Sequence, residues 1–294
     1  VFARSPEELD DMTADTAEHA ATLLEIDAEN KLNRAFDARF KIRRTASPNG
    51  TVIGLIFGMI AAARVLRDAS PTEAATVAHG LMIMVRRHID GPLPAPPPQQ
   101  TQSSPAPRYD PLSRWQDGHT LFICLDQGLI AQLVAILEAL NAGDLDSARI
   151  GLESAAAIFH ATAVALLQTG AMSREEYESI VRPTMEPPNV AAGFSGTFLA
   201  EHRRLLRLVK EVNTALSNRP AELSDAYDRY VMAINASYSA HRHCCELVAG
   251  DKPSLAKARL DENGTAAADS LKKFGHRALR SAGHHIITPN QTET

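Results

Sequence analysis

The sequence predicts an all-α protein, and three observations support this fold class. Apolar residues recur at helical spacing through most of the chain, and no stretch shows the sustained alternation of apolar and polar residues that is typical of strands. No internal repeat is visible. Several segments begin with a serine followed by proline or acidic residues, as helix N-termini do. We therefore expect a helical bundle.

Residues 1–90 are predicted to form an N-terminal helical region. Ser5, followed by Pro6 and two acidic residues, is expected to start the first helix, and Ser70 a later one by the same capping logic. The expected helices span residues 5–43, 51–66 and 70–90, with a turn at 47–50. Because 51–66 is almost entirely apolar, it suits the centre of a bundle.

Residues 91–114 are predicted to be a linker or an exposed loop. The run from Gly91 to Tyr109 is rich in proline, glutamine and serine, so it can neither bury a core nor keep helical hydrogen bonds. This segment separates the N-terminal helices from a larger helical domain at 115–294. The two helical parts are also compatible with packing as one compact unit.

The larger domain is expected to contain helices at 121–140, 145–168 and 197–216, a capped helix starting at Ser173, and a helix at 236–250. Asp126 and Gln127 lie inside the apolar helix 121–140, which predicts either a hydrogen-bonded core network or a cavity. His160 is expected to be a core histidine. Residues 182–196 are irregular, and ordered loops of this length are often functional.

Composition excludes several classes of function. The 294 residues carry a net charge of -5, so the chain has no basic excess for a nucleic-acid partner. The longest apolar run, Thr51 to Ala63, is too short to span a bilayer, and no membrane segment is expected. Three cysteines form no disulfide framework, which favours a reducing, cytoplasmic compartment. Since the sequence begins with Val1, we expect the reading frame to start earlier.

The pair His241 and Cys245 is the strongest candidate for a cofactor site. Four residues apart on a helix, the imidazole and the thiol leave the same face one turn from each other. We expect His241 to ligate a haem iron and Cys245 to add to a vinyl group at the ring edge, although the motif Cys-x-x-Cys-His is absent. Cys244 is the competing thioether donor. His202, beside Glu201, is the second ligand candidate.

Two other interpretations of this stretch stay open. His241 and Cys245 could both be core residues, since cysteine is among the most buried residue types. Alternatively, His241, His243, Cys244 and Cys245 are all zinc ligand types, although adjacent helical cysteines point about 100° apart and would be hard to wrap around one ion.

Several motifs together resemble a known family. They are Asp117-Gly118-His119-Thr120-Leu121-Phe122-Ile123 with Asp126-Gln127, Arg182 with Pro183 and Pro187, and Gly193-Phe194-Ser195. This order resembles the histidine-ligated haem-dependent aromatic oxygenases typified by tryptophan 2,3-dioxygenase. The resemblance implies a helical bundle of that type with a haem held between helices. This chain departs from the dioxygenases in having Asp126-Gln127 where they have His-Gln, and in a longer loop before Gly193.

Within that superfamily, the sequence is more similar to the tyrosine-hydroxylating branch. His241 follows His202 by 39 residues and begins a His-x-x-x-Cys motif that ends at Cys245. The resemblance covers residues 115–250 and implies two axial histidines, His202 and His241, with a single thioether bond to Cys245. It also implies that Arg182 binds the substrate carboxylate and that Ser195 belongs to the substrate-binding loop.

The resemblance further implies hydroxylation of 3-methyl-L-tyrosine to 3-hydroxy-5-methyl-L-tyrosine by hydrogen peroxide, as a step of antibiotic biosynthesis. With two axial histidines, one must leave before peroxide can react, and we expect it to be His202, which would then also move protons. His119 is the second candidate for proton transfer. A haem-dependent hydroxylase or dioxygenase acting on another aromatic amino acid, a non-catalytic bis-histidine haem protein, and a homo-oligomeric state all stay open.

Overall fold

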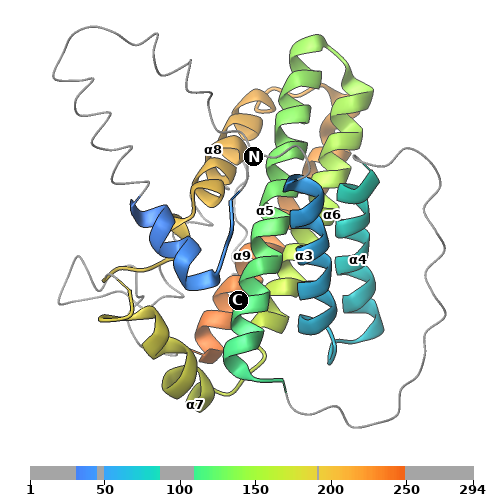
Figure 1. The fold of residues 1–294 in the computed structure, drawn as a ribbon. Coiled ribbons are helices and arrows are strands. Elements are labelled where there is room, and N and C mark those ends of the chain that lie inside the picture. Colours follow the sequence, from blue (N-terminus) through green and yellow to red (C-terminus); the bar gives the residue numbers. More distant parts are fainter. Residues whose placement is uncertain (1–30, 45–49, 87–108, 191, 249–294) are drawn as a thin grey trace, which may run out of the picture.

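The computed structural model describes residues 31–44, 50–86, 109–190 and 192–248, and it is helical throughout (Figure 1). No strand occurs in these ranges, so the prediction of an all-α fold is confirmed. The first described helix covers residues 31–40. The longer helices that follow are α3 (Gly50–Val65), α4 (Pro71–Arg86), α5 (Pro111–Ala142), α6 (Leu145–Thr169), α8 (Ala200–Ala215) and α9 (Ser224–Val248).

Helix α5 is the central element of the bundle. It packs against α3, α6 and α8, while α6 also packs against α4 and α9 (Figure 1). One face of α5 is a column of fully buried apolar side chains four residues apart, namely Leu121, Leu125, Leu129 and Leu133. Because α3 and α4 pack on α5 and α6, the N-terminal helices and the larger C-terminal part share one core.

The predicted helix starts at Ser70 and Ser173 are confirmed. Each serine hydroxyl accepts a hydrogen bond from the backbone N–H three residues later, and a glutamate at that position, Glu73 or Glu176, accepts one in return from the serine N–H. Helix α5 begins earlier than expected, because the carboxylate of Asp110 accepts from the backbone N–H of Ser113. Residues 111–114 of the segment predicted as a linker at 91–114 belong to this helix, and its residues 91–108 lie outside the described ranges.

The chain between α6 and α8 is built from short helical pieces. Helix α7 (Arg174–Glu176) continues into a π-helical turn at Tyr177–Val181 and a 3₁₀ turn at Arg182–Met185. A further 3₁₀ turn, Gly196–Phe198, precedes α8, which starts three residues later than expected, at Ala200. These pieces are anchored by buried apolar side chains, including Met185, Phe194 and Phe198, which form a second core with Phe36 and Phe40.

Two helices, α5 and α6, are long and apolar enough to cross a membrane when judged by length and composition alone. In the protein, 56% and 61% of the two apolar windows are buried against other helices, as is usual for central helices of a bundle. The apolar run considered from the sequence, 51–63, lies in α3, which is shorter.

The burial of His160 and of helix α3 differs from what the sequence predicts. His160, expected in the core, is exposed on α6, because its neighbours Ile158 and Phe159 occupy the buried face of the helix. Helix α3, expected at the centre of the bundle, buries only one face. Its other face exposes large apolar side chains among the described residues, namely Val52, Ile53, Ile56, Phe57, Met59 and Ile60.

Two glycines of α3 provide a matched test of this packing. A Cβ at Gly58 would lie 2.4 Å from Sγ of Cys124 on α5, whereas a Cβ at Gly54 would meet nothing closer than 3.8 Å. We expect Gly58→Ala to destabilise the fold by about 1–3 kcal/mol through overpacking. Gly54→Ala should stabilise it by about 0.5–1 kcal/mol through helix propensity. Thermal unfolding of both variants measures the difference, and equal effects would contradict the packing of α3 on α5.

Candidate functional site

The two histidines predicted as ligands lie on different helices, His202 in the first turn of α8 and His241 near the end of α9. Helix α8 packs on α5 and α9 packs on α6, but α8 and α9 make at most marginal contact with each other. Both rings remain accessible, with 38% of the His202 side chain exposed and His241 also exposed. The charge on His202 nevertheless affects the titration of His241, so the two rings lie within electrostatic reach of each other.

A buried carboxylate from α5 orients the His202 ring. Asp126 is only 4% exposed, and its Oδ2 lies 3.1 Å from Nδ1 of His202. Because a carboxylate accepts, Nδ1 carries the hydrogen and Nε2 is left free to bind a metal or a proton. Desolvation lowers the pKa of His202, but the charge and hydrogen bond of Asp126 together outweigh it and raise this pKa. A histidine held by a carboxylate in this way is a typical metal ligand.

His241 and Cys245 lie on the same α9 helix, one turn apart, as the sequence predicts. Although the side chain is accessible, desolvation by the surrounding protein atoms and the charge of the nearby His202 lower the pKa of His241 to about 4, so the imidazole is neutral at pH 7. The Cys245 thiol is partly accessible, whereas Cys244 is 6% exposed and lies against Gly170. Cys245 is therefore the cysteine that can reach a ligand on the His241 side.

His119, the second candidate for proton transfer, lies on α5 in an aromatic cluster. Its ring stacks on Phe40 with centroids 4.0 Å apart and contacts Trp115 at 4.7 Å. Nδ1 lies 2.8 Å from the carbonyl oxygen of Trp115, which can only accept, so Nδ1 is the protonated nitrogen and Nε2 is free. Burial lowers the pKa of His119 to about 4, and the charges of Arg39 and His241 act in the same direction.

The structure gives Arg182 two acidic neighbours. Its Nε donates to Glu186 at 2.8 Å, and its Nη1 lies 4.0 Å from Glu178. Both acids are four residues away, and the arginine side chain is only 14% exposed. Ser195, the other predicted substrate residue, is partly buried, and its carbonyl oxygen accepts from the N–H of Phe198 in the turn before α8. The charge of Arg182 is therefore already balanced by acids of its own segment.

The zinc interpretation gains no support from the described part of the chain. Those residues contain no cluster of three or more histidine, cysteine, aspartate or glutamate side chains that could hold a metal ion. A structural zinc site requires about four such ligands around one point.

The residues present fit a haem better. Haem iron is held by neutral imidazole on one or both sides of a flat ring. Here an oriented imidazole on α8 and a neutral imidazole on α9 belong to helices that do not pack together, and an accessible thiol lies one turn from His241. Asp126 is the functional residue whose role the sequence did not reveal, because its partner lies 76 residues away.

Comparison with known proteins shows what this chain is similar to. The profile of the SfmD 3-methyl-L-tyrosine peroxygenase family matches residues 3–226. A 3-methyl-L-tyrosine peroxygenase from Streptomyces lavendulae is 26% identical over 242 residues, which cover 79% of this chain and 66% of that protein, just under two thirds of its length. A crystal structure of reduced SfmD, soaked with sodium hydrosulfite, is similar with a TM-score of 0.59 and 25% identity, covering 72% of this chain and 73% of that chain.

The low pKa of His119 predicts a dependence of stability on pH. The unfolded chain binds a proton near pH 6.5 and the folded protein only near pH 4, so the free energy of unfolding falls as the pH falls between these values. We expect His119→Gln, which can still donate to the Trp115 carbonyl, to lose less thermal stability between pH 6.5 and 4 than the parent. His79→Gln, at an exposed histidine of α4, controls for loss of a histidine as such. Identical pH profiles for the parent and His119→Gln would contradict the buried, neutral state of this ring.

Proposed function

The chain belongs to the SfmD 3-methyl-L-tyrosine peroxygenase family, and on this basis we propose that it is a haem-dependent peroxygenase that hydroxylates the phenol ring of 3-methyl-L-tyrosine with hydrogen peroxide. The expected product is 3-hydroxy-5-methyl-L-tyrosine, an intermediate suited to antibiotic biosynthesis. The observation that carries the proposal is the pair His202 and His241 on separate helices, with His202 oriented by Asp126.

Three side chains would hold the haem. His202 and His241 offer one imidazole from each of α8 and α9, and Cys245 offers the thiol for a single thioether bond on the His241 side. When bound, haem supplies the redox chemistry that transfers one oxygen atom from peroxide to the ring. The protein must orient the phenol, exclude competing reactions and move the protons.

We assign the exchangeable axial position to His202. Its helix follows an irregular segment that includes the 3₁₀ turn Gly196–Phe198, whereas His241 lies on the helix that also carries the proposed covalent bond. The carboxylate of Asp126 holds Nδ1 of His202 through a hydrogen bond that does not depend on what Nε2 binds. The His202 ring thus keeps this hydrogen bond whether or not Nε2 binds the iron, which lowers the free-energy cost of releasing Nε2.

His119 is suited to proton transfer. A general base must be neutral at the working pH and must present a free nitrogen. His119 meets both conditions, since its Nε2 is free and its pKa is lowered to about 4. The carbonyl of Trp115 and the stacked ring of Phe40 fix the orientation of the imidazole, so that Nε2 accepts a proton from a peroxide or phenol in one direction only.

The activity itself is the first test. The purified haem-loaded protein should convert 3-methyl-L-tyrosine, with hydrogen peroxide, into a product one oxygen atom heavier, as detected by liquid chromatography and mass spectrometry. His119→Gln should bind the amino acid with unchanged affinity but turn over about 10²–10⁴ times more slowly, as expected when a general base is lost. Absence of a hydroxylated product from 3-methyl-L-tyrosine or L-tyrosine would refute the proposed activity.

The thioether bond is tested with two neighbouring cysteines. After denaturation in acid solvent, the parent polypeptide should retain one haem mass. We expect Cys245→Ser to release its haem under these conditions, whereas the buried Cys244→Ser should keep it attached, because only Cys245 is accessible on the His241 side. Retention of haem in Cys245→Ser and its loss in Cys244→Ser would reverse the assignment of the donor.

A further inference from the structure

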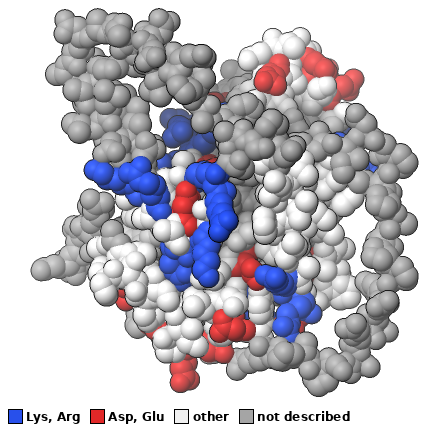
Figure 2. All heavy atoms as spheres, in the orientation of Figure 1, with Lys and Arg blue, Asp and Glu red and all other residues white. Residues whose placement is uncertain are grey.

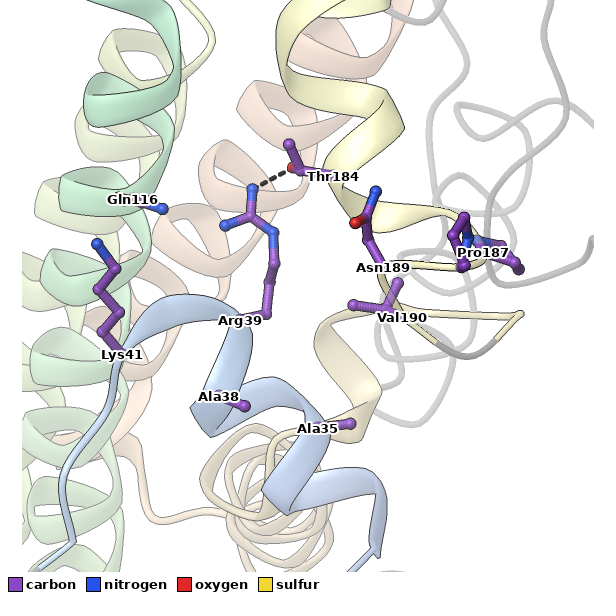
Figure 3. A pocket seen from close by; sticks show the side chains of 10 residues that line it. Ala35, Ala38, Arg39, Lys41, Gln116, Thr184, Pro187, Asn189 and Val190 are labelled. Carbon is purple, nitrogen blue, oxygen red and sulfur yellow. Dashed lines mark hydrogen bonds between the residues drawn. The ribbon is translucent and has the colours of Figure 1, made fainter.

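A cavity of about 750 Å³ lies between the helix of residues 31–40, the start of α5 and the segment that follows the 3₁₀ turn Arg182–Met185 (Figure 3). Its polar lining consists of Arg39, Lys41, Gln116, Thr184 and Asn189. Among the described residues, the rest of the lining is alanine, proline and valine, with no acidic side chain. A cavity with two cationic groups, several hydrogen-bonding groups and no acid is suited to an anion.

Arg39 is the central polar group of this cavity. Figure 3 shows its guanidinium between α5 and Thr184, and one Nη atom donates to the Thr184 hydroxyl. Nε of Arg39 is buried without a hydrogen-bond partner, and no carboxylate pairs with this arginine among the described residues. An arginine that is partly desolvated and lacks an anion leaves a planar fork of donors free for a ligand.

The surrounding surface attracts anions as well. Figure 2 shows Lys and Arg side chains gathered over the helix of residues 31–40 and the chain that follows it. Within this group, Arg44 is already bound to Asp37 and Glu201, so the acids nearest to the segment are occupied. Lys41 has a positive φ of 56°, unusual for a residue other than glycine, and this conformation directs the chain so that Lys41 lines the cavity.

The cavity also adjoins the proposed reaction site. Gln116 lies on α5 one turn before His119, and Phe40, the residue after Arg39, stacks on the His119 ring. The charge of Arg39 influences the titration of His119. A molecule whose carboxylate binds Arg39 can therefore extend an aromatic ring toward the side of α5 that carries His119.

We propose that Arg39, supported by Thr184 and Lys41, binds the α-carboxylate of the aromatic amino-acid substrate. This inference rests on the proposed function and assigns the carboxylate to Arg39 in place of Arg182. The two arginines differ in their partners: Arg182 is ion-paired to Glu186 and Glu178, while Arg39 donates to the Thr184 hydroxyl and lies over the Phe40 ring. Arg39 has no carboxylate partner among the described residues, whereas the charge of Arg182 is already balanced by two.

The test uses three ligands and the haem-loaded full chain. The ligands are 3-methyl-L-tyrosine, its decarboxylated amine, and the corresponding phenylpropanoate, which keeps the carboxylate but lacks the amine. Calorimetry gives the dissociation constant of each ligand for the parent, Arg39→Gln, Arg39→Lys and Arg182→Lys. Arg43→Gln, at an exposed arginine beyond the same helix and outside the cavity lining, controls for a general change of surface charge. Circular dichroism checks that each variant is folded.

We expect Arg39→Gln to weaken both carboxylate-bearing ligands by about 10- to 100-fold and to leave the amine unchanged. Arg39→Lys should be intermediate, because it keeps the charge but loses the planar fork. Unchanged affinities in Arg39→Gln, a loss confined to Arg182→Lys, or no binding of any carboxylate to the parent would each overturn the assignment. Carboxylate binding that depends on Arg39 without hydroxylation under peroxide would retain the assignment and reject the proposed function.

Discussion

The hydrogen bond between Asp126 and His202 is the interaction on which the site depends. It joins α5 to α8 and places a carboxylate, only 4% exposed, in the core of the bundle. Burying a carboxylate costs free energy unless it has a hydrogen-bond partner, so the folded state favours His202 at this position. The same bond selects the ring nitrogen that remains free. One buried acid therefore determines both the position and the tautomer of His202.

Helix α5 brings the separate functions of the site together. Gln116, His119 and Asp126 lie on one side of this helix, and His119 and Asp126 are two turns apart. Gln116 lines the cavity beside Arg39, His119 is held by the carbonyl of Trp115, and Asp126 orients His202. The same helix also carries the buried leucine column of the core. Because α5 is anchored in the core, these three side chains keep fixed positions relative to one another.

Local signals in the sequence predict much of this architecture. Contacts between residues that lie far apart in the chain could not be predicted from it. The caps at Ser70 and Ser173 and the shared face of His241 and Cys245 depend on residues within one turn, and the structure contains them. The partner of Asp126 lies 76 residues away, so only the fold could reveal it. The ion pairs of Arg182 with Glu178 and Glu186 follow an i, i+4 spacing that is visible in the sequence. Arg39 belongs to no sequence motif, so its place in the cavity could not be predicted from the sequence.

The central claim is that His202 and His241 bind opposite faces of one haem iron. Electron paramagnetic resonance of the purified ferric protein tests it most directly, because two imidazole ligands give a low-spin iron. The account predicts a low-spin signal in the parent and a high-spin signal in His202→Ala, with haem still present. A protein without haem, or a high-spin parent spectrum that His202→Ala leaves unchanged, would contradict the claim.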